Sequence, residues 1–317
     1  MVLATLAGGA AWTARQIFEA PGPLDHSRDV VVPRGAPALL AQTLRQAGVV
    51  GSTRDFRIAA LLTRDRGPLH AAEFAFPAGA SLRQVLDILR SARPVQHYLT
   101  IPEGLTAAQI ALVTERADDL TGETPVPPEG DVLPQSYAYE YGTSRAAVIA
   151  RAATAMRRAL AEAWEDRAPD VPLANPEQML ILASIVERET AEPEERPHVA
   201  AVFLNRLRLG MKLQSDPTVA YAVSGGESTA ERGITRAELD FANPYNTYHI
   251  AGLPPGPIDS PGVASLQAVA QPAASDDLYF VADGTGGHVF ARTLEEHNRN
   301  VARWRAQAQA PAQVPAR

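Results

Sequence analysis

Residues 175–190 read NPEQMLILASIVERET, an apolar helix that ends in two glutamates. Asn175 supplies an N-cap, Pro176 suits the first helical position, and Gln178 completes a capping-box pattern. The run that follows is apolar almost all round, which predicts a buried helix rather than one on the surface. This segment therefore predicts the centre of a helical core.

The two glutamates at the end of this helix point to different sides. Glu187 shares a helix face with Ser184, whereas Glu189 points roughly the opposite way. A carboxyl group on an apolar face is poorly solvated, which favours its neutral form, as a general acid requires. The alternative is a structural ion pair of Glu187 with Arg206 or Arg208. From this segment alone, the ion pair is the better interpretation.

Further motifs follow in a fixed order. They are residues 202–207 (VFLNRL), 213–221 (LQSDPTVAY), 243–248 (NPYNTY), 252–258 (GLPPGPI), 278–284 (LYFVADG) and 287–290 (GHVF). With the glutamate helix they resemble the YceG-like family, the endolytic murein transglycosylases called MltG, over about residues 30–305. The resemblance implies that the first glutamate, Glu187, is the catalytic acid.

The resemblance also implies a reaction. It is the lytic cleavage of the MurNAc–GlcNAc β-1,4 bond within nascent peptidoglycan strands, which leaves 1,6-anhydro ends and terminates elongation. Glu187 would protonate the bridging oxygen and then, as a carboxylate, take the proton of the muramic C6 hydroxyl. A glycoside hydrolase ordinarily needs two carboxylates, and the sequence offers no convincing partner for Glu187. No cofactor and no metal is expected.

The candidate substrate-binding residues are mostly polar or aromatic side chains on these motifs. They are Ser184, Asn205, Gln214, Asp216, Thr218, Asn243, Tyr245, Asn246, Tyr248, Leu253 and Pro254. Structural interpretations stay open for each group. Gln214 could hold a turn, Asp216 is most simply an N-cap, and residues 243–248 could form an Asx-turn loop with its tyrosines packed on the core. The proline-rich residues 253–258 could wall a cleft or cap the domain.

Composition excludes several classes of protein. The net charge of −7 and the lack of a basic cluster argue against a nucleic-acid partner. There is no cysteine, which excludes thiol catalysis, and the scattered histidines, including His288 and His297, look structural. Similar sequences have also been labelled aminodeoxychorismate lyase, a pyridoxal-phosphate enzyme that needs a lysine, and Lys212 is the only one. A non-catalytic wall-binding module is the stronger alternative.

The domain organisation follows from a repeated pattern of strand, Pro-x-Gly turn and helix. It starts near residues 30, 74 and 99, and Ser81 and Thr106 stand at N-cap positions. The pattern predicts an α+β fold, with a linker at 19–29, a small βα domain at 30–95, a mixed α/β catalytic domain at 96–307 and a disordered tail at 308–317. The resemblance implies that the small domain is LysM-like, a kind of module that binds GlcNAc-containing chains. A spacer that packs on the catalytic domain is the equal alternative.

Residues 1–12 are small and apolar but short, since a membrane-spanning helix needs about 20 such residues. We interpret residues 1–18 as part of a transmembrane anchor, the alternative being a disordered or loosely docked apolar tail. The resemblance implies a single-pass protein of the bacterial inner membrane with its catalytic domain in the periplasm. Its expected partners are peptidoglycan strands, the inner membrane and peptidoglycan synthases.

Overall fold

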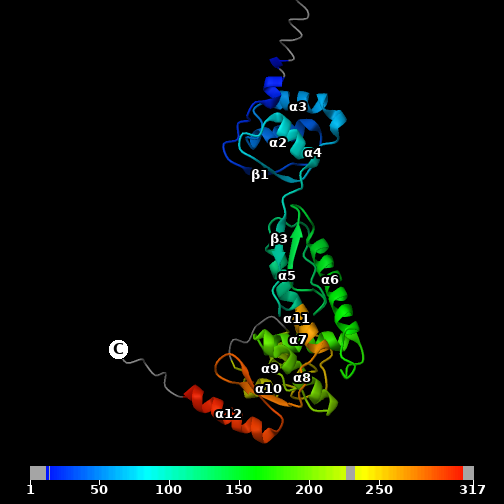
Figure 1. Cartoon of the computed structure of the whole chain (residues 1–317), viewed down its shortest axis with the longest axis vertical. Helices are drawn as coiled ribbons and strands as arrows, with labels where there is room; N and C mark the ends of the chain where they lie inside the picture. Colours follow the sequence, from blue (N-terminus) through cyan, green and yellow to red (C-terminus); the bar gives the residue numbers. More distant parts are fainter. Residues whose placement is uncertain (1–11, 14, 226–232, 310–317) are drawn as a thin grey trace, which may run out of the picture. The chain divides into compact units, whose positions relative to one another are not determined.

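The computed structural model describes residues 12–13, 15–225 and 233–309. The chain folds into two compact units, Met1–Tyr98 with Ala138–Thr143, and Leu99–Tyr137 with Ser144–Arg317. Figure 1 shows the helices and strands of both. Most of the expected anchor, at 1–18, and of the expected tail, at 308–317, lies outside the described residues.

The first unit is built in the order strand, helix, helix, strand, helix. Strand β1 (Arg28–Val31) pairs antiparallel with β2 (Glu73–Phe76), and Val30 stands opposite Phe74. Its helices are α2 (Pro37–Gln46), α3 (Thr53–Leu62) and α4 (Leu82–Ser91), with a short 3-10 turn, η1 (Arg64–Arg66), after α3. In Figure 1 the three helices lie together, with β1 beneath them.

Apolar residues from both strands and all three helices just described form the core of this unit. Phe56, Phe74 and Phe76 are fully buried there, together with Leu44 and Leu86. Removing this much apolar surface from water is the main stabilising contribution to a domain of this size. Helix α3, which carries Phe56, lies between the first two strand–helix copies and was not among the elements expected from the sequence.

The second unit is mostly helical. Its helices are α5 (Ala107–Glu115), α6 (Arg145–Glu165), α7 (Pro176–Glu189), the short turn η2 (Pro193–Glu195), α8 (Arg196–Arg208), α9 (Asp216–Ser224), α10 (Arg236–Leu239), α11 (Val263–Ala270) and α12 (Leu294–Gln309). Strands β3 (His97–Thr100) and β4 (Ser136–Tyr139) pair with each other, and the residues of both are divided between the two units. In the second unit, β5 (Tyr279–Ala282) pairs antiparallel with β6 (His288–Ala291). The hairpin expected across residues 283–287 is confirmed.

Helix α7 is the centre of the second unit, as its apolar sequence predicts. It packs against α6, α8, α9 and α11, and its residues Met179, Leu182 and Ile185 are fully buried. Asn175 caps its start, since its side chain accepts a hydrogen bond from the Gln178 amide (2.9 Å). The Gln178 side chain accepts from Ala174 rather than from the cap residue, so the expected capping box is not formed. The buried residues of α7 lie between Met179 and Val186, and its last turn, which carries Glu187 and Glu189, departs from the core.

The other helix starts agree well with the sequence. Ser81 and Thr106 form full capping boxes, Ser144 caps α6, and Thr293 and Glu296 bond reciprocally at the start of α12. The expected fold class, a mixture of helices with small sheets, is confirmed. In the described ranges no helix combines the length and the apolar character that crossing a membrane requires.

Candidate active site

Glu187 is held by contacts within the protein. Its Oε1 lies 3.1 Å from Arg196 Nη2, and its Oε2 accepts a hydrogen bond from the Gly262 amide at 2.9 Å. The Glu187 side chain is only 5% exposed, and Arg196 also lies 3.6 Å from Glu103. Each oxygen of Glu187 therefore has a protein partner, and the group ties the end of α7 to the starts of α8 and α11.

The expected arginine partners of Glu187 were wrong. Its partner is Arg196, at the first position of α8, because the short turn η2 brings that helix start back beside the last turn of α7. Arg208 pairs with Asp170 instead (3.2 Å), and Arg206 lies close enough to Glu189 to lower the pKa of that carboxyl.

Glu189 has a different environment. The Ser215 hydroxyl donates a hydrogen bond to its Oε1 (2.5 Å), and the residue remains half-buried. Burial raises the pKa of Glu189 to about 7, and the neighbouring carboxylate of Asp216 acts in the same direction. The Ser215 hydrogen bond and the charges of His288 and Arg206 oppose this rise in pKa. A carboxyl that is partly protonated near neutral pH can both donate and accept a proton, as general acid–base catalysis requires.

Ser215 is fixed in place by two buried threonines. Its amide donates to Thr247 Oγ1 (2.9 Å), while Thr218 Oγ1 donates to the Ser215 carbonyl (2.6 Å). The two threonine hydroxyls lie 2.8 Å apart, and both residues are fully buried. Thr218, a candidate substrate-binding residue, therefore acts by holding the loop that presents Ser215 to Glu189.

Asp216 and Tyr248 lie on the same side as Glu189. The Tyr248 hydroxyl donates to Asp216 Oδ1 (2.6 Å), and burial together with this hydrogen bond raises the pKa of Tyr248, so it stays a neutral phenol. The expectation that Asp216 is an N-cap was wrong: Ser215 occupies the cap position, and its side chain bonds Glu189 instead of the helix. Asp216 thus begins the helix with its carboxylate exposed beside the glutamate.

Gln214 is the residue before this cap and has an unusual backbone. Its φ of +54° is in the left-handed region, where non-glycine residues are uncommon. Its amide donates to the Thr247 carbonyl (3.2 Å), and the residue is exposed. Such strained conformations cluster at functional sites, so Gln214 remains a candidate for contact with a substrate.

The sequence did not show that two further groups, Arg206 and His288, act on Glu189. Arg206 is buried and donates to the carbonyls of Leu213 (2.6 Å) and Leu278 (2.6 Å). His288, expected to be structural, pairs through Nδ1 with Glu195 (2.7 Å). The charges of Arg206 and His288 act on Glu189 from α8 and from β6. No local pattern could have shown this, because they meet Glu189 only through the packing of distant segments.

Several candidate substrate-binding residues have structural roles. Ser184 is fully buried, donates to the Ile181 carbonyl and accepts from the Ile258 amide. Asn205 donates to the carbonyls of Ser275 (2.8 Å) and Asp277 (3.0 Å). Both side chains hold distant segments together, and among the described residues no hydrogen bond joins either of them to Glu189.

On the loop at 243–248, some candidate residues have structural roles and one reaches the site around Glu189. Asn246 is fully buried, and its amide nitrogen donates to the carbonyls of Leu239 (3.0 Å) and Phe241 (2.8 Å). Its side-chain oxygen accepts from the Tyr248 amide, and Asn243 makes the same kind of turn with Tyr245 (2.9 Å). The assignment of Asn246 to the substrate is therefore corrected: its polar groups hold the loop. Of this loop, Tyr248 is the side chain that reaches Asp216.

The remaining candidates pack on the core. Tyr245 stacks at a tilt on Tyr221, with ring centroids 4.8 Å apart, and both rings border the main core of the second unit. Leu253 also packs on that core, and Pro254 is buried. The proline-rich residues 253–258 thus cover the domain, one of the two alternatives that the sequence left open.

Asp259 is a buried carboxyl outside this cluster. It is 1% exposed, and neither of its oxygens has a hydrogen-bond partner among the described residues. Burial raises the pKa of Asp259 well above 3.8; the Arg188 charge opposes the rise, and the carboxylates of Glu187 and Glu129 add to it. Folding therefore favours the protonated form of Asp259, and ionisation of this carboxyl lowers the stability of the protein.

We expect the substitution Asp259→Asn to stabilise the protein increasingly as the pH rises. Because the folded-state pKa is raised above 3.8, the wild type loses stability as the pH rises from that value through the folded pKa, and the variant does not. The expected gain in unfolding free energy at pH 8 is on the order of 1–3 kcal/mol. Urea unfolding of both proteins from pH 4 to pH 8 measures it. A difference that is independent of pH would show that Asp259 is ionised with a partner throughout.

Among the residues that the structure describes, no group of three or more histidine, aspartate and glutamate side chains is arranged to hold a metal ion. The site consists of Glu189 with Ser215, Asp216, Tyr248, Arg206 and His288. It provides a protonatable carboxyl among hydrogen-bonding groups, an arrangement suited to acid–base chemistry.

Comparison with known proteins identifies the family of this chain. The YceG-like family model matches residues 30–303. The chain belongs to the YceG-like family. A crystal structure of a YceG-like protein from Listeria monocytogenes is 28% identical to it, with a TM-score of 0.54, covering 87% of this chain and 99% of that one.

Two curated relatives carry the name endolytic murein transglycosylase. The protein of Streptococcus pneumoniae serotype 2 (strain D39) is 29% identical over 350 residues, which cover 95% of this YceG-like chain and 63% of the relative. The protein of Bacillus subtilis (strain 168) is 42% identical over 122 residues, covering 38% of this chain and 33% of the relative. The chain thus spans less than two thirds of the length of either relative.

Proposed function

We propose that this chain is an endolytic peptidoglycan lytic transglycosylase that cuts the MurNAc–GlcNAc β-1,4 bond within glycan strands. Its membership of the YceG-like family and the names of its relatives support this proposal. The observation that carries it in this chain is Glu189, a half-buried carboxyl whose pKa is about 7.

Glu189 is the better candidate for the catalytic acid, in place of Glu187. Glu187 has a protein partner on each oxygen, and its side chain is nearly inaccessible. Among the described residues, the Glu189 side chain accepts one hydrogen bond, from Ser215, and it shares its side of α7 with Asp216 and Tyr248. The role of Glu187 in this proposal is to hold the last turn of α7 in position.

The proposed reaction needs one acid–base group. Protonated Glu189 gives its proton to the bridging oxygen as the bond from that oxygen to muramic C1 breaks. The resulting carboxylate then accepts the proton of the muramic C6 hydroxyl while the C6 oxygen bonds to C1. The product is a 1,6-anhydro end, no water is consumed, and Glu189 regains its proton. The Ser215 hydrogen bond and the charge of Arg206 stabilise the carboxylate between the two steps.

Asp216, Tyr248 and Gln214 are proposed to orient the sugar. Asp216 and Gln214 are exposed beside Glu189, and the Tyr248 hydroxyl fixes the Asp216 carboxylate. A hydroxyl or acetamide group of the glycan can hydrogen-bond to exposed side chains of this kind. The Tyr248 carbonyl also accepts a hydrogen bond from Lys212 Nζ (3.0 Å). Lys212 is the lysine that a pyridoxal-phosphate enzyme would need, and this hydrogen bond engages it.

Digestion of purified sacculi tests the proposal. The wild-type chain should release soluble glycan fragments whose ends resist borohydride reduction, since an anhydro end has no reducing aldehyde. Binding to sacculi without any release would support the non-catalytic wall-binding module instead. A pyridoxal absorbance band in the purified protein would support the lyase.

The remaining assignments are also proposals. We propose that the first unit is a LysM-like domain, a suggestion supported by its strand, helix, helix, strand order. We further propose that the apolar residues at 1–18 belong to a membrane anchor, and that the enzyme works in the periplasm beside peptidoglycan synthases. Fractionation of cells that produce the protein, with detection in the membrane fraction, would test the anchor.

A further inference from the structure

Helix α3 of the first unit presents an apolar outer face to solvent. Phe56 and Ala59 point into the core, whereas Ile58, Leu61 and Leu62 are 46%, 61% and 73% exposed. Large aliphatic side chains gathered on one short helix are unusual for a surface that remains in water. The contacts within the unit do not account for them.

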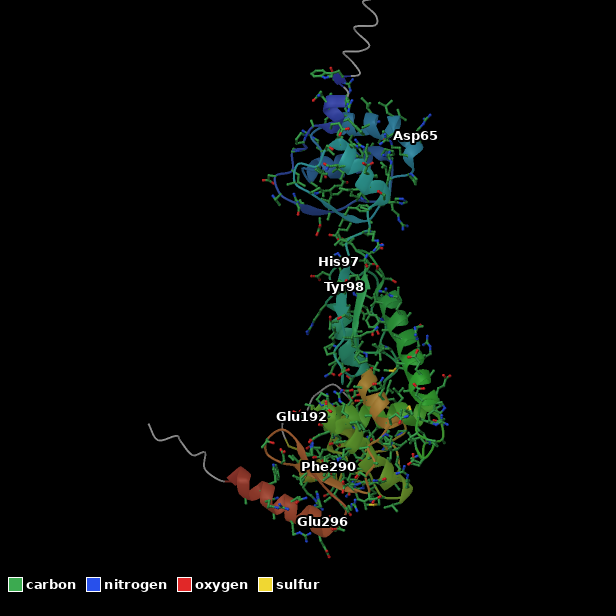
Figure 2. The ribbon with its side chains drawn as sticks, viewed as in Figure 1. Asp65, His97, Tyr98, Glu192, Phe290 and Glu296 are labelled. Atoms are coloured by element: carbon green, nitrogen blue, oxygen red, sulfur yellow. The ribbon has the colours of Figure 1, made fainter. Side chains whose placement is uncertain are left out.

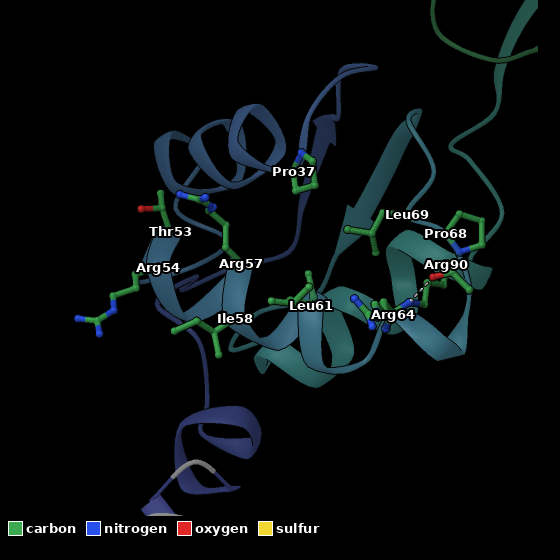
Figure 3. Close-up of a pocket in the computed structure, with 12 residues that line it drawn as sticks. Pro37, Thr53, Arg54, Arg57, Ile58, Leu61, Arg64, Pro68, Leu69 and Arg90 are labelled. Atoms are coloured by element: carbon green, nitrogen blue, oxygen red, sulfur yellow. Dashed lines mark hydrogen bonds between the residues drawn. The ribbon is translucent and has the colours of Figure 1, made fainter.

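A groove runs along this face. It has a volume of about 880 Å³ and is bordered by the start of α2, by α3 and by the segment after η1. Figure 3 shows Ile58 and Leu61 along α3, with Pro37 and Leu69 on the other borders of the groove. Its floor is therefore apolar.

Arginines surround the apolar floor. Arg54, Arg57 and Arg64 line the groove, all three are exposed, and none has a side-chain partner among the described residues. Arg90 also lines the groove but is held by the Gly67 carbonyl (3.1 Å) and the Thr63 hydroxyl (2.9 Å), which fixes the segment after α3. Three free guanidinium groups beside exposed aliphatic side chains therefore form one continuous surface.

Few acidic groups offset these charges. On α3 and the η1 turn, Asp55 and Asp65 are the acids, against Arg54, Arg57, Arg64 and Arg66. Asp65 lies on the turn after α3 (Figure 2) and does not line the groove. The local charge is positive although the whole chain carries −7. This positively charged surface therefore favours a negatively charged binding partner.

We propose that this face, formed by Arg54, Arg57, Ile58, Leu61, Leu62 and Arg64, docks onto the surface of an anionic lipid bilayer. Aliphatic side chains of an amphipathic helix enter the boundary between head groups and acyl chains, while its arginines contact lipid phosphates. Arginines near an anionic membrane add attraction that salt screens. Peptidoglycan also carries negative charge, on the carboxylates of its stem peptides, but it offers no apolar layer to the exposed side chains of Ile58, Leu61 and Leu62, which is why the observations favour lipid. This inference is independent of the proposed reaction.

Sedimentation with vesicles tests the docking face. The full chain is mixed with vesicles of phosphatidylcholine and phosphatidylglycerol (3:1), or of phosphatidylcholine alone. The test variant is the triple substitution Arg54→Gln, Arg57→Gln and Arg64→Gln. Its matched control, Arg157→Gln, Arg299→Gln and Arg303→Gln, removes the same charge from exposed positions of the second unit. We expect the test variant to lose at least ten-fold in partitioning to anionic vesicles, and the control to bind like the wild type.

The double variant Leu61→Ser with Leu62→Ser tests the contribution of the aliphatic side chains to vesicle binding. It should weaken binding to anionic vesicles while leaving the decrease with salt in place, because the arginines remain. Both side chains are exposed, so thermal unfolding of the variant should match the wild type, which shows that a loss of binding is not a loss of folding.

Three results would overturn the proposal. Equal binding of the arginine variant and the wild type to anionic vesicles would show that this face does not contact lipid. Complete displacement by glycerol phosphate at constant ionic strength would indicate a site for a soluble phosphate. Loss of sacculus binding in the arginine variant, without any vesicle binding by the wild type, would assign the groove to glycan.

Discussion

Glu189→Gln is expected to abolish the release of glycan fragments from sacculi. Glutamine keeps the shape of the side chain and can still accept a hydrogen bond from Ser215, but it cannot give or take the proton. General acid–base groups typically contribute about 10²–10⁴-fold to a rate, so the residual activity should be at most about 1%. The melting temperature should stay the same or rise slightly, since the substitution removes a poorly solvated acid.

The matched control is Glu187→Gln, two residues earlier on the same helix. It weakens the ion pair with Arg196, which is itself only 12% exposed. We therefore expect a loss of stability of about 1–3 kcal/mol with activity per folded molecule reduced less than ten-fold. If Glu187→Gln abolishes release while Glu189→Gln leaves it intact, the assignment implied by the sequence resemblance is the right one.

The pH dependence of the activity tests the role of Glu189 in a second way. Because the pKa of Glu189 is about 7, its protonated form is lost as the pH rises through that value. The wild-type kcat/KM should therefore fall above about pH 7 if Glu189 is the acid that starts the reaction.

Asn246→Ala is expected to destabilise the protein strongly. The Asn246 side chain is fully buried, and the substitution removes its hydrogen bonds to the carbonyls of Leu239 and Phe241 and the acceptor for the Tyr248 amide. We expect a loss of about 2–4 kcal/mol, since each of these three hydrogen bonds contributes about 1 kcal/mol to stability. Differential scanning calorimetry should show a melting temperature lower by at least about 5 °C.

Asn243→Ala is the control on the same loop. Asn243 is partly exposed, and its donor contact, to the Ala222 carbonyl, is long (3.3 Å), so the loss should be smaller. An unchanged melting temperature for Asn246→Ala, together with lower activity, would show that Asn246 binds the substrate and does not hold the loop.

Local patterns predicted the helix starts of this protein well. Ser81, Thr106 and Ser144 bond to amides three residues away, so their role is contained within a short stretch of sequence. The position of α7 at the centre of the core followed from its apolar residues in the same way. Ser215 also stands at a cap position, but the hydroxyl bonds Glu189 across 26 residues of sequence, so the local rule assigned the cap to the wrong residue.

The choice between the two glutamates could not be made from the sequence. Helical spacing shows that Glu187 and Glu189 face different sides, but not which segments cover each side. Arg196 and Gly262 reach Glu187 only because η2 and the start of α11 fold back onto the end of α7. The same applies to His288, whose charge acts on Glu189 from a strand far along the chain. Tertiary packing therefore decides which of the two carboxyl groups, Glu187 or Glu189, has a protein partner on each oxygen.

Digestion of sacculi in water enriched in ¹⁸O, followed by mass spectrometry of the released muropeptides, tests the central claim most directly. Asp216 lies beside Glu189, so a hydrolase that uses two carboxylates is the competing mechanism. If Glu189 acts alone as acid and base, the products should be lighter by one water than hydrolase products and carry no ¹⁸O at their new ends. Reducing ends that have gained one ¹⁸O would contradict the account and make the enzyme a hydrolase.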